Sequence, residues 1–303
     1  MEFTHVDKNG HTKMVDVSHK EDTLRYAKAY GRIYLPRQVI EMIIENKIKK
    51  GDVLTVAKIA AIMASKKTSD LIPLCHNINL SYSDIEYTID LENNFIEAIS
   101  IVKTKSPTGV EMEAINSIMI FLETIYDMCK GVTRDIIISD IQLIEKYGGK
   151  SGYFLNEKFG IVLSINISKE KGTPKQSIEM ANVIENFGIE GDAHAGSSHR
   201  QVSMLDQSSI DKMKEYNIPG LCFGKFAENI TTKNVDFSKL KIGSTLKIGS
   251  DVILEISQIG KKCHGSGCEI ARTVGVCIMP TEGLFAKVIK GGQIKMGDII
   301  RIK

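Results

Sequence analysis

Two charged residues stand where an apolar helix is expected to end. Asp127 and Lys130 lie three residues apart in IMIFLETIYDMCKGV, residues 118–132, whose apolar composition predicts a buried helix. Burying either charge alone is costly, whereas a carboxylate and an ammonium at this spacing can pair along a helix or move protons to a bound molecule. From the spacing alone, the pair is either a structural ion pair or a reaction site.

Further residues whose side chains could take part in a reaction occur in the same half of the chain. His76 in LIPLCHNINL could be a core histidine bonded to a backbone carbonyl, and Cys75 and Cys129 could be small buried apolar residues. Glu111 and Glu113 stand two apart, so they point to different faces of a helix and could simply favour its N-terminus. Taken one at a time, each of these residues has a structural explanation.

The second half carries glycines and soft-ligand atoms. The glycines of GIEGDAHAG, residues 188–196, predict tight turns that bring backbone N–H groups close to an anion. Cys263, His264 and Cys268 in KKCHGSGCEI could bind a metal, but Cys-x4-Cys is not a regular structural zinc spacing. We therefore expect no metal centre, with structural zinc as the alternative.

Composition indicates a cytoplasmic protein. The 303 residues carry a net charge of +2 and are 25% charged, so we expect neither a nucleic-acid nor a membrane partner. No stretch approaches the roughly 18 apolar residues that a membrane span requires, and the polar start MEFTHVDKNG lacks the apolar core of a signal peptide. The six cysteines are expected to be thiols in a reducing compartment.

The elements that must position the first group of residues are mixed helices and strands. Apolar spacings of three and four in residues 23–35 and 38–48 favour two helices, and residues 51–68 predict a third, capped by Asp52. INLSYSDIEYTIDL and FIEAISIVKTK alternate as two paired strands do, and DIIISDIQLIEKYGG predicts a strand with a helical or irregular end. This order predicts an α+β sandwich with helices on one face of an antiparallel sheet.

The character of the chain changes near residue 155. Only DQSSIDKMKEYN is clearly helical beyond that point. Short β-type runs separated by turn residues are GIVLSINIS, QVSML, STLKIGSDVILEISQIG, VGVCIMP and GDIIRIK. We therefore predict two domains, residues 1–155 and a mostly-β barrel over residues 158–303.

Six motifs of the first half stand in the order found in one enzyme family. MVDVS, KGDV, LIPLCH, TGVEMEA, YDMCK and GGKSG resemble the cyclic pyranopterin monophosphate synthase family over about residues 3–153. The resemblance implies that 3′,8-cyclo-7,8-dihydro-GTP is converted to cyclic pyranopterin monophosphate, with release of diphosphate and closure of a cyclic phosphate. It also implies a ferredoxin-like α/β sandwich, no cofactor, and a hexamer built from dimers through this domain with the active site at a subunit interface. The resemblance assigns catalysis to Lys50, His76, Asp127, Lys130 and Lys146, and substrate binding to Arg25, Cys75, Glu111, Met112 and Glu113.

The residue types suit the chemistry that the resemblance implies. Ring opening and reclosure require protons to move at several atoms, which calls for positioned acids and bases. A lysine can serve as a base if burial or neighbouring cations lower its pKa, and Asp127 can orient Lys130. Arg25 and the lysines suit the triphosphate and the leaving diphosphate. With the resemblance in view, the Asp127 and Lys130 pair is interpreted as a reaction site.

The second half resembles the MOSC domain family over about residues 158–303. The segments that carry the resemblance are GIEGDAHAG, RQVSML, FAENITT, KKCHGSGCEI and MPTEGLFAKVIKGGQIKMGDII. It implies a β-rich domain that binds molybdenum cofactor or a precursor, or handles sulfur for it. Cys263 matches the single cysteine of the family, with Cys268 as the alternative, and the lysines at 261 and 262 would favour a thiolate. The remaining site residues implied are Asp192, His194, Arg200, Glu228 and Asn229, of which Asp192 and Asn229 could instead cap turns.

Together the two resemblances predict a bifunctional protein of molybdenum cofactor biosynthesis. Two alternatives from other functional classes remain open at this point. In one, the first half is a non-catalytic scaffold that binds a pterin or a nucleotide. In the other, the second half is a structural β-barrel that only supports oligomerisation.

Overall fold

The computed structural model describes residues 10–171, 173–216, 218–262, 275 and 277–302, and the chain divides into two compact units. These are Met1–Asn156 and Glu157–Lys303, and each has its own buried apolar core. No helix among the described residues combines the length and the apolar character needed to cross a membrane.

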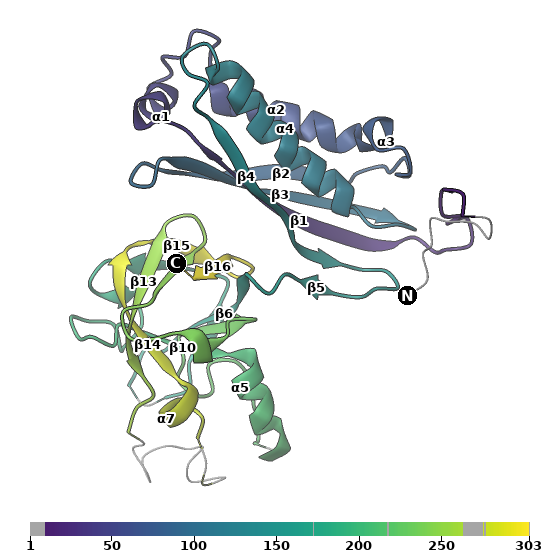
Figure 1. Cartoon of the computed structure of the whole chain (residues 1–303). Helices are drawn as coiled ribbons and strands as arrows, with labels where there is room; N and C mark the ends of the chain where they lie inside the picture. Colours follow the sequence, from purple (N-terminus) through teal and green to yellow (C-terminus); the bar gives the residue numbers. More distant parts are fainter. Residues whose placement is uncertain (1–9, 172, 217, 263–274, 276, 303) are drawn as a thin grey trace. The chain divides into compact units, whose positions relative to one another are not determined.

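The first unit is an antiparallel sheet with helices packed on one face (Figure 1). Its sheet has the strand order β2-β3-β1-β4-β5, so β1 is central. Its elements are β1 (Thr23–Tyr34), α1 (Arg37–Ile44), α2 (Val53–Lys66), α3 (Thr68–Leu71), β2 (Tyr82–Asp90), β3 (Phe95–Ser106), α4 (Glu111–Cys129), β4 (Ile137–Tyr147) and β5 (Phe154–Leu155). The α+β sandwich expected from the order of elements is confirmed.

Strand β1 corrects a sequence prediction. Residues 23–35 were expected to be helical, but Thr23–Tyr34 form a strand that pairs with β3 on one side and β4 on the other. Ala27, Ala29 and Ile33 alternate into the core beneath the helices. Strand β4 also continues to Tyr147, so the helical or irregular end expected there is wrong.

Helix α4 lies so close to β1 that only a glycine fits between them. A Cβ atom on Gly31 would stand 2.5 Å from Ile118 Cγ2 and 2.7 Å from Leu122 Cδ1. Both of these side chains are fully buried in α4, as is Phe121. This contact fixes α4 against the middle of the sheet, and with it the positions of both helix ends.

The exposed side of α4 runs from one end of the helix to the other. Met112, Met119, Glu123, Asp127 and Lys130 are exposed at successive spacings of seven, four, four and three residues. The helix is therefore not buried all round within one chain, contrary to the expectation from its apolar composition. The charged pair lies at the C-terminal end of this exposed stripe.

The second unit is built around a closed β-barrel, as the short β-type runs predict. Its elements are β6 (Gly160–Ile167), β7 (Gln176–Ile178), β8 (Met180–Ile184), β9 (Gly188–Ile189), β10 (Val202–Asp206), α5 (Gln207–Lys212), η1 (Met213–Tyr216), β11 (Ile230–Lys233), η2 (Phe237–Lys239), β12 (Thr245–Ile248), β13 (Val252–Ile259), α7 (Met279–Glu282), β14 (Leu284–Lys290), β15 (Gly292–Lys295) and β16 (Ile299–Ile302). The seven strands β11, β10, β14, β13, β12, β16 and β6 form a ring, because β6 pairs again with β11. Strand β7 extends from β6, and β15, β8 and β9 form a separate small sheet.

One β-type run in this unit is not a strand where the structure describes it. VGVCIMP was expected to be extended, but Met279 and Pro280 begin the short helix α7, which has proline in its first turn. The expected strands in the other four runs are present as β6, β10, β12 with β13, and β16.

Candidate functional site

The C-terminal end of α4 holds two lysines around one carboxylate. Lys130 Nζ lies 2.7 Å from Asp127 Oδ1, and Lys50 Nζ lies 2.8 Å from Asp127 Oδ2 and 2.7 Å from the Asp127 carbonyl oxygen. Lys50 precedes Gly51, whose φ of +100° turns the chain into α2, where Asp52 caps the helix by accepting a hydrogen bond from the Thr55 N–H. We call Lys50, Asp127 and Lys130 the lysine triad.

Charge within the lysine triad is fixed by its hydrogen bonds. Those from Lys130 and Lys50 lower the pKa of Asp127 to about 2, and Asp127 in turn raises the pKa of Lys130. The side chains of Asp127 and Lys130 are 53% and 52% exposed, so the pair is not buried within one chain. In the single chain Lys130 is therefore a charged ammonium, and the lowered lysine pKa that a base would need is absent.

A second group of the expected residues lies at the N-terminal end of α4. Lys146 Nζ stands 4.0 Å from Glu111 Oε1 and donates to Ser151 Oγ. Arg25 is buried and donates through Nε to the Ser106 carbonyl at 3.2 Å and through Nη2 to the Pro107 carbonyl at 3.0 Å.

The glycines of GGKSG admit the Arg25 side chain. Gly148 and Gly149 both have positive φ, and a Cβ on Gly149 would overlap Arg25 Nη1. Only glycine combines this backbone conformation with this closeness. The motif therefore shapes the backbone around Arg25.

Buried Glu113 lies in the same region. Burial, aided by the nearby charge of Glu111, raises the pKa of Glu113 to about 7. Burial and the charge of Glu113 raise the pKa of the Cys75 thiol. The neighbouring His76 places Nε2 2.8 Å from the Val15 carbonyl oxygen, the backbone partner that a structural histidine would have.

The expected synthase residues thus form two groups that do not meet within one chain. Glu111 and Asp127 are 16 positions apart in one helix, which corresponds to about 24 Å along its axis. The lysine triad lies at one end, and Glu111, Glu113 and Lys146 lie at the other. Met112 is exposed on the first turn of α4.

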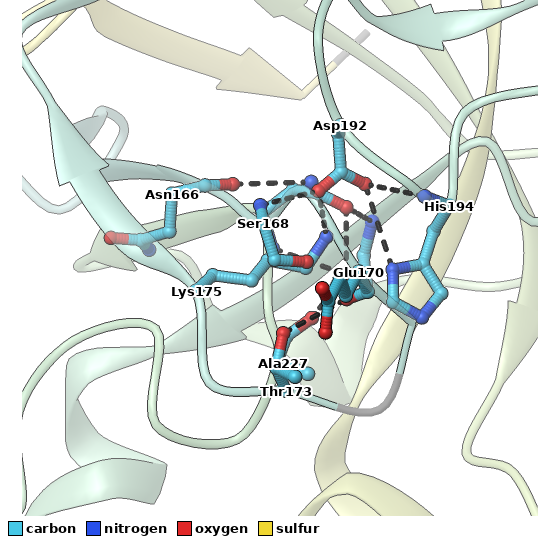
Figure 2. A network of polar contacts seen from close by, with 10 residues as sticks. Asn166, Ser168, Glu170, Thr173, Lys175, Asp192, His194 and Ala227 are labelled. Atoms are coloured by element: carbon cyan, nitrogen blue, oxygen red, sulfur yellow. Dashed lines mark hydrogen bonds and ion pairs between the residues drawn. The ribbon is translucent and has the colours of Figure 1, made fainter.

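In the second unit, expected residues and one unexpected lysine surround Asp192 (Figure 2). Lys175 Nζ lies 2.5 Å from Asp192 Oδ1, the Ser168 N–H donates to the same oxygen at 3.0 Å, and the His194 N–H donates to Oδ2 at 3.1 Å. Although burial raises the pKa of Asp192, hydrogen bonds from Lys175, Ser168 and Asn229 lower it overall.

The sequence analysis did not identify Lys175. It follows a proline in the turn before β7, within KGTPKQS, where an exposed lysine is the ordinary expectation. Its side chain is completely buried, and burial lowers its pKa despite the ion pair with Asp192. No local sequence pattern marks such a residue, because its partner lies 17 positions away.

Glu228 and Asn229 lie inside the second unit and hold its backbone. Glu228 is fully buried and accepts hydrogen bonds from the N–H groups of Gly224 and Phe226, at 2.5 and 3.1 Å. Burial raises the pKa of Glu228. Asn229 accepts from the Ser203 N–H at 3.1 Å through its side chain. Both residues shape the loop beside Asp192 through backbone contacts.

Arg200 and Lys261 face the same aromatic ring. The Arg200 guanidinium carbon lies 5.7 Å and Lys261 Nζ 6.0 Å from the centroid of Phe285. Burial, and then the charges of Lys175, Lys171 and Lys261, lower the pKa of His194 against the opposite effect of Asp192.

Cys263, His264 and Cys268 lie outside the described residues, and among the described residues no cluster of three or more His, Cys, Asp or Glu side chains forms a metal site.

Comparisons with known proteins match the two units separately. Residues 14–149 match the MoaC family, and residues 191–301 match the MOSC domain. The cyclic pyranopterin monophosphate synthase of Thermoanaerobacter sp. (strain X514) is 48% identical over 157 residues, which are 52% of this chain and 99% of that protein. The molybdenum cofactor biosynthesis protein moc-5 of Caenorhabditis elegans is 46% identical over 156 residues, which are 52% of this chain and 26% of that protein. Among solved structures, the YuaD protein of Bacillus subtilis has a TM-score of 0.41 and 16% identity to this chain. The match covers 48% of this chain and 95% of the YuaD chain.

Proposed function

The chain belongs to the MoaC family and carries a MOSC domain, and on this premise we propose that it is a bifunctional protein of molybdenum cofactor biosynthesis. Its N-terminal unit acts as a cyclic pyranopterin monophosphate synthase, a lyase that converts 3′,8-cyclo-7,8-dihydro-GTP with release of diphosphate. The observation that carries this proposal is the lysine triad, formed at hydrogen-bond distances by three residues that the family motifs supply. We also propose a cytoplasmic location, which the composition of the chain favours.

The lysine triad supplies hydrogen-bond donation and anion binding. Two ammonium groups around one carboxylate leave a net positive charge at the exposed C-terminal end of α4, which attracts a triphosphate. Because Asp127 raises the pKa of Lys130, this lysine holds its proton and serves as a positive charge and hydrogen-bond donor, for example toward a phosphate or a leaving oxygen. Asp127 orients both lysines, since each of its oxygens accepts from one of them.

Glu113 complements the lysine triad. With a pKa of about 7, it can accept or donate a proton at the operating pH, which suits the ring rearrangement. Lys146 and Arg25, at the same end of α4, supply positive charge for phosphate groups. Catalysis by Glu113 together with the triad requires both groups to face one substrate.

A second copy of the chain is the means of bringing them together. The two groups stand about 24 Å apart along α4, farther than one substrate can bridge for chemistry. Val56, Ile59 and Met63 form an exposed apolar stripe on α2 at spacings of three and four, a surface typical of a subunit contact. We therefore propose a homo-oligomer, of the hexamer type that the resemblance implies, in which the triad of one copy faces the Glu113 group of another.

For the C-terminal unit we propose binding of the molybdenum cofactor or a precursor. When bound, that cofactor would supply a metal centre held by a pterin that bears a phosphate group. The donor set around Asp192 fits such a ligand, because Lys175, His194 and Ser168 present cationic and neutral donors, with Lys171 and Lys261 nearby. Sulfur handling at Cys263 is a further proposal that rests on the sequence motif.

The direct test is turnover of the cyclised substrate by the purified full-length protein. Enzymatically prepared 3′,8-cyclo-7,8-dihydro-GTP is added, and diphosphate and pterin product are measured, with Lys130→Ala as the inactive control. Product from the wild type alone supports the lyase. Absence of product from a well-folded oligomer would favour the alternative of a pterin-binding or nucleotide-binding scaffold.

A further inference from the structure

The MVDVS segment, residues 14–18, contacts the body of the first unit through its backbone. The Val15 carbonyl oxygen lies 2.8 Å from His76 Nε2, a contact between residues 61 positions apart in the chain. Val15 and Val17 are half-buried, so the segment is packed there as well as bonded. The segment is one of the six family motifs, yet neither the lysine triad nor the group around Glu113 includes it.

Two consecutive turns restrict the backbone that follows the Val15 carbonyl. Asp16 Oδ1 accepts from the Ser18 N–H at 2.9 Å and from Ser18 Oγ at 2.6 Å. The Lys20 N–H then donates to the Val17 carbonyl at 3.0 Å. An aspartate that bonds the backbone two residues further on is a common way to fix a turn. Asp16 therefore limits the directions that the preceding Val15 carbonyl can take.

The contact with Val15 decides which nitrogen of the neutral His76 ring carries the proton. A carbonyl oxygen can only accept, so Nε2 must donate the hydrogen bond. A neutral imidazole has one N–H, which leaves Nδ1 with a lone pair and no proton. Nδ1 has no hydrogen-bond partner among the described residues, and it is not one of their buried polar atoms without a partner. It is therefore an acceptor that is open to a ligand.

The proposed lyase requires an acceptor of this kind. Lys130 of the lysine triad holds its proton, and an ammonium has three N–H donors but no lone pair. Ring opening also requires a proton to be taken from the substrate, for which a lone pair is needed. The thiol of Cys75, next to His76 in the chain, is close enough to Glu113 to be affected by its charge. His76 thus lies in the same region as the Glu113 group.

We propose that the MVDVS segment positions His76 so that Nδ1 accepts from an N–H or O–H group of the substrate. The identity of that substrate rests on the proposed function. Rings derived from guanine and the hydroxyls of a ribose supply such donors, whereas an ionised phosphate oxygen is itself an acceptor. His76 therefore contacts the ring or sugar part of the substrate, and Asp16 is a positioning residue that acts through the Val15 carbonyl.

The first experiment measures the reactivity of His76 in the full-length protein without a ligand. Diethyl pyrocarbonate acylates imidazole nitrogens that carry no proton, and mass spectrometry of the peptide that contains His76 gives the rate. Asp16→Ala removes the turn, whereas Asp16→Asn keeps an oxygen that can accept from the Ser18 N–H. Glu21→Ala is the matched control for the loss of an exposed carboxylate just beyond the segment.

Asp16→Ala should speed the acylation of His76 about fivefold, the factor that one hydrogen bond of ordinary net strength imposes. Release from the Val15 carbonyl makes Nε2 available, which is the less hindered ring nitrogen, whereas only Nδ1 lacks a proton in the wild type. Asp16→Asn and Glu21→Ala should react as the wild type does, and all the melting temperatures should agree. Equal rates in all four proteins would overturn the proposed orientation.

The second experiment connects this orientation to turnover of 3′,8-cyclo-7,8-dihydro-GTP. Asp16→Ala should lower kcat about tenfold with little change in KM, because the acceptor is present but poorly held, and Asp16→Asn should restore kcat. His76→Gln and His76→Arg then test the kind of contact. Glutamine can donate to Val15 and still accept from the substrate, whereas arginine can only donate. We expect a lower KM for His76→Gln, and the reverse order would show that His76 contacts phosphate instead.

The two experiments separate failure of this inference from failure of the proposed function. If the wild type makes no product, the lyase proposal fails, and the acylation rates alone decide whether the segment orients His76. If the wild type turns over and Asp16→Ala is equally active, the lyase stands and the positioning role of the segment is refuted.

Discussion

Among single residues, Asp127 has the most consequential position, because both of its oxygens hold a lysine. The distances of 2.7 and 2.8 Å to Lys130 and Lys50 are those of charge-assisted hydrogen bonds. The three side chains are about half exposed, so solvent screens the pairing and little of the fold depends on it. Holding three long side chains together costs conformational freedom and adds little stability. A role in the reaction therefore explains the arrangement better than a role in stability.

Replacing Asp127 with asparagine should therefore affect turnover and not folding. Asp127→Asn keeps the size of the side chain but removes the charge that orients both lysines, so diphosphate release should fall by at least about 100-fold. The far-ultraviolet circular dichroism and the melting temperature should match the wild type. A variant that turns over normally would show that the triad is a surface ion pair.

Glu113 should give the first unit a distinctive dependence of stability on pH. Its pKa of about 7 in the folded protein exceeds the ordinary value of 4.5, so folding favours its protonated form. This contribution is fully present below pH 4.5 and is lost as the pH rises through 7, amounting to about 3 kcal/mol. Urea unfolding between pH 5 and 8 should show the loss in the wild type.

Glu113→Gln supplies the matched comparison, because glutamine keeps the shape and cannot ionise. Its unfolding free energy should change less between pH 5 and 8 than that of the wild type. The opposite sign applies to Asp127, whose lowered pKa gives only a small, solvent-screened contribution above pH 3.8 that is lost as the pH falls toward 2. Identical pH profiles for Glu113→Gln and the wild type would contradict the role of burial at this position.

Prediction of single residues from the sequence depended on how local their signal was. The synthase residues stand in short motifs, which is why the sequence singled them out, but the contact that brings Lys50 to Asp127 across 77 positions comes from the structure alone. Lys175 was missed because burial of a lysine depends on the strand that covers it and on a partner distant in sequence. Which residues share a site across subunits depends on how the copies assemble. The spacing of residues along one chain does not determine it.

At the scale of elements, β1 shows why periodicity misled the sequence analysis. Its inward residues, Ala27, Ala29, Gly31 and Ile33, alternate with Tyr26, Lys28, Tyr30 and Arg32. The inward alanines and glycine are only weakly apolar, and the outward tyrosines are partly apolar too, so the two faces differ little in hydrophobicity. The strand period of two is therefore hidden, and an apparent helical period of three to four remains. Strands β2 and β3 were predicted correctly because β-branched and aromatic residues are frequent in both.

The contact between β1 and α4 can be tested with one methyl group. Gly31→Ala should destabilise the first unit by about 1–3 kcal/mol, because the new Cβ would overlap Ile118 and Leu122 in a close-packed core. Urea unfolding at neutral pH measures the change. Gly131→Ala is the matched control, since a Cβ there meets no atom within 4 Å and the residue is not left-handed. Similar effects of the two substitutions would mean that the sheet and the helix can separate at little cost.

At the scale of the whole molecule, the two ends of α4 make one chain insufficient for the proposed reaction. Each chain would contribute its lysine triad to one site and its Glu113 group to another. Activity then belongs to a pair of neighbouring copies.

Co-expression of two inactive variants tests this division. Lys130→Ala removes the triad, and Lys146→Ala alters the other group, so each variant alone should be inactive. Mixed oligomers assembled at random should recover about one quarter of the wild-type activity, because one site in four receives both intact halves. A mixture no more active than either variant would place the complete site within one chain.

The barrel of the second unit begins and ends with neighbouring strands. Gly160 in β6 pairs with Ile300 in β16, and the same β6 closes the ring against β11. A unit whose first and last strands are hydrogen-bonded to each other can be joined to another protein at either end, or inserted into a surface loop, without stretching its host. In evolutionary terms the second unit is a portable module, which gene fusion can attach to a working enzyme without disturbing the fold of either part.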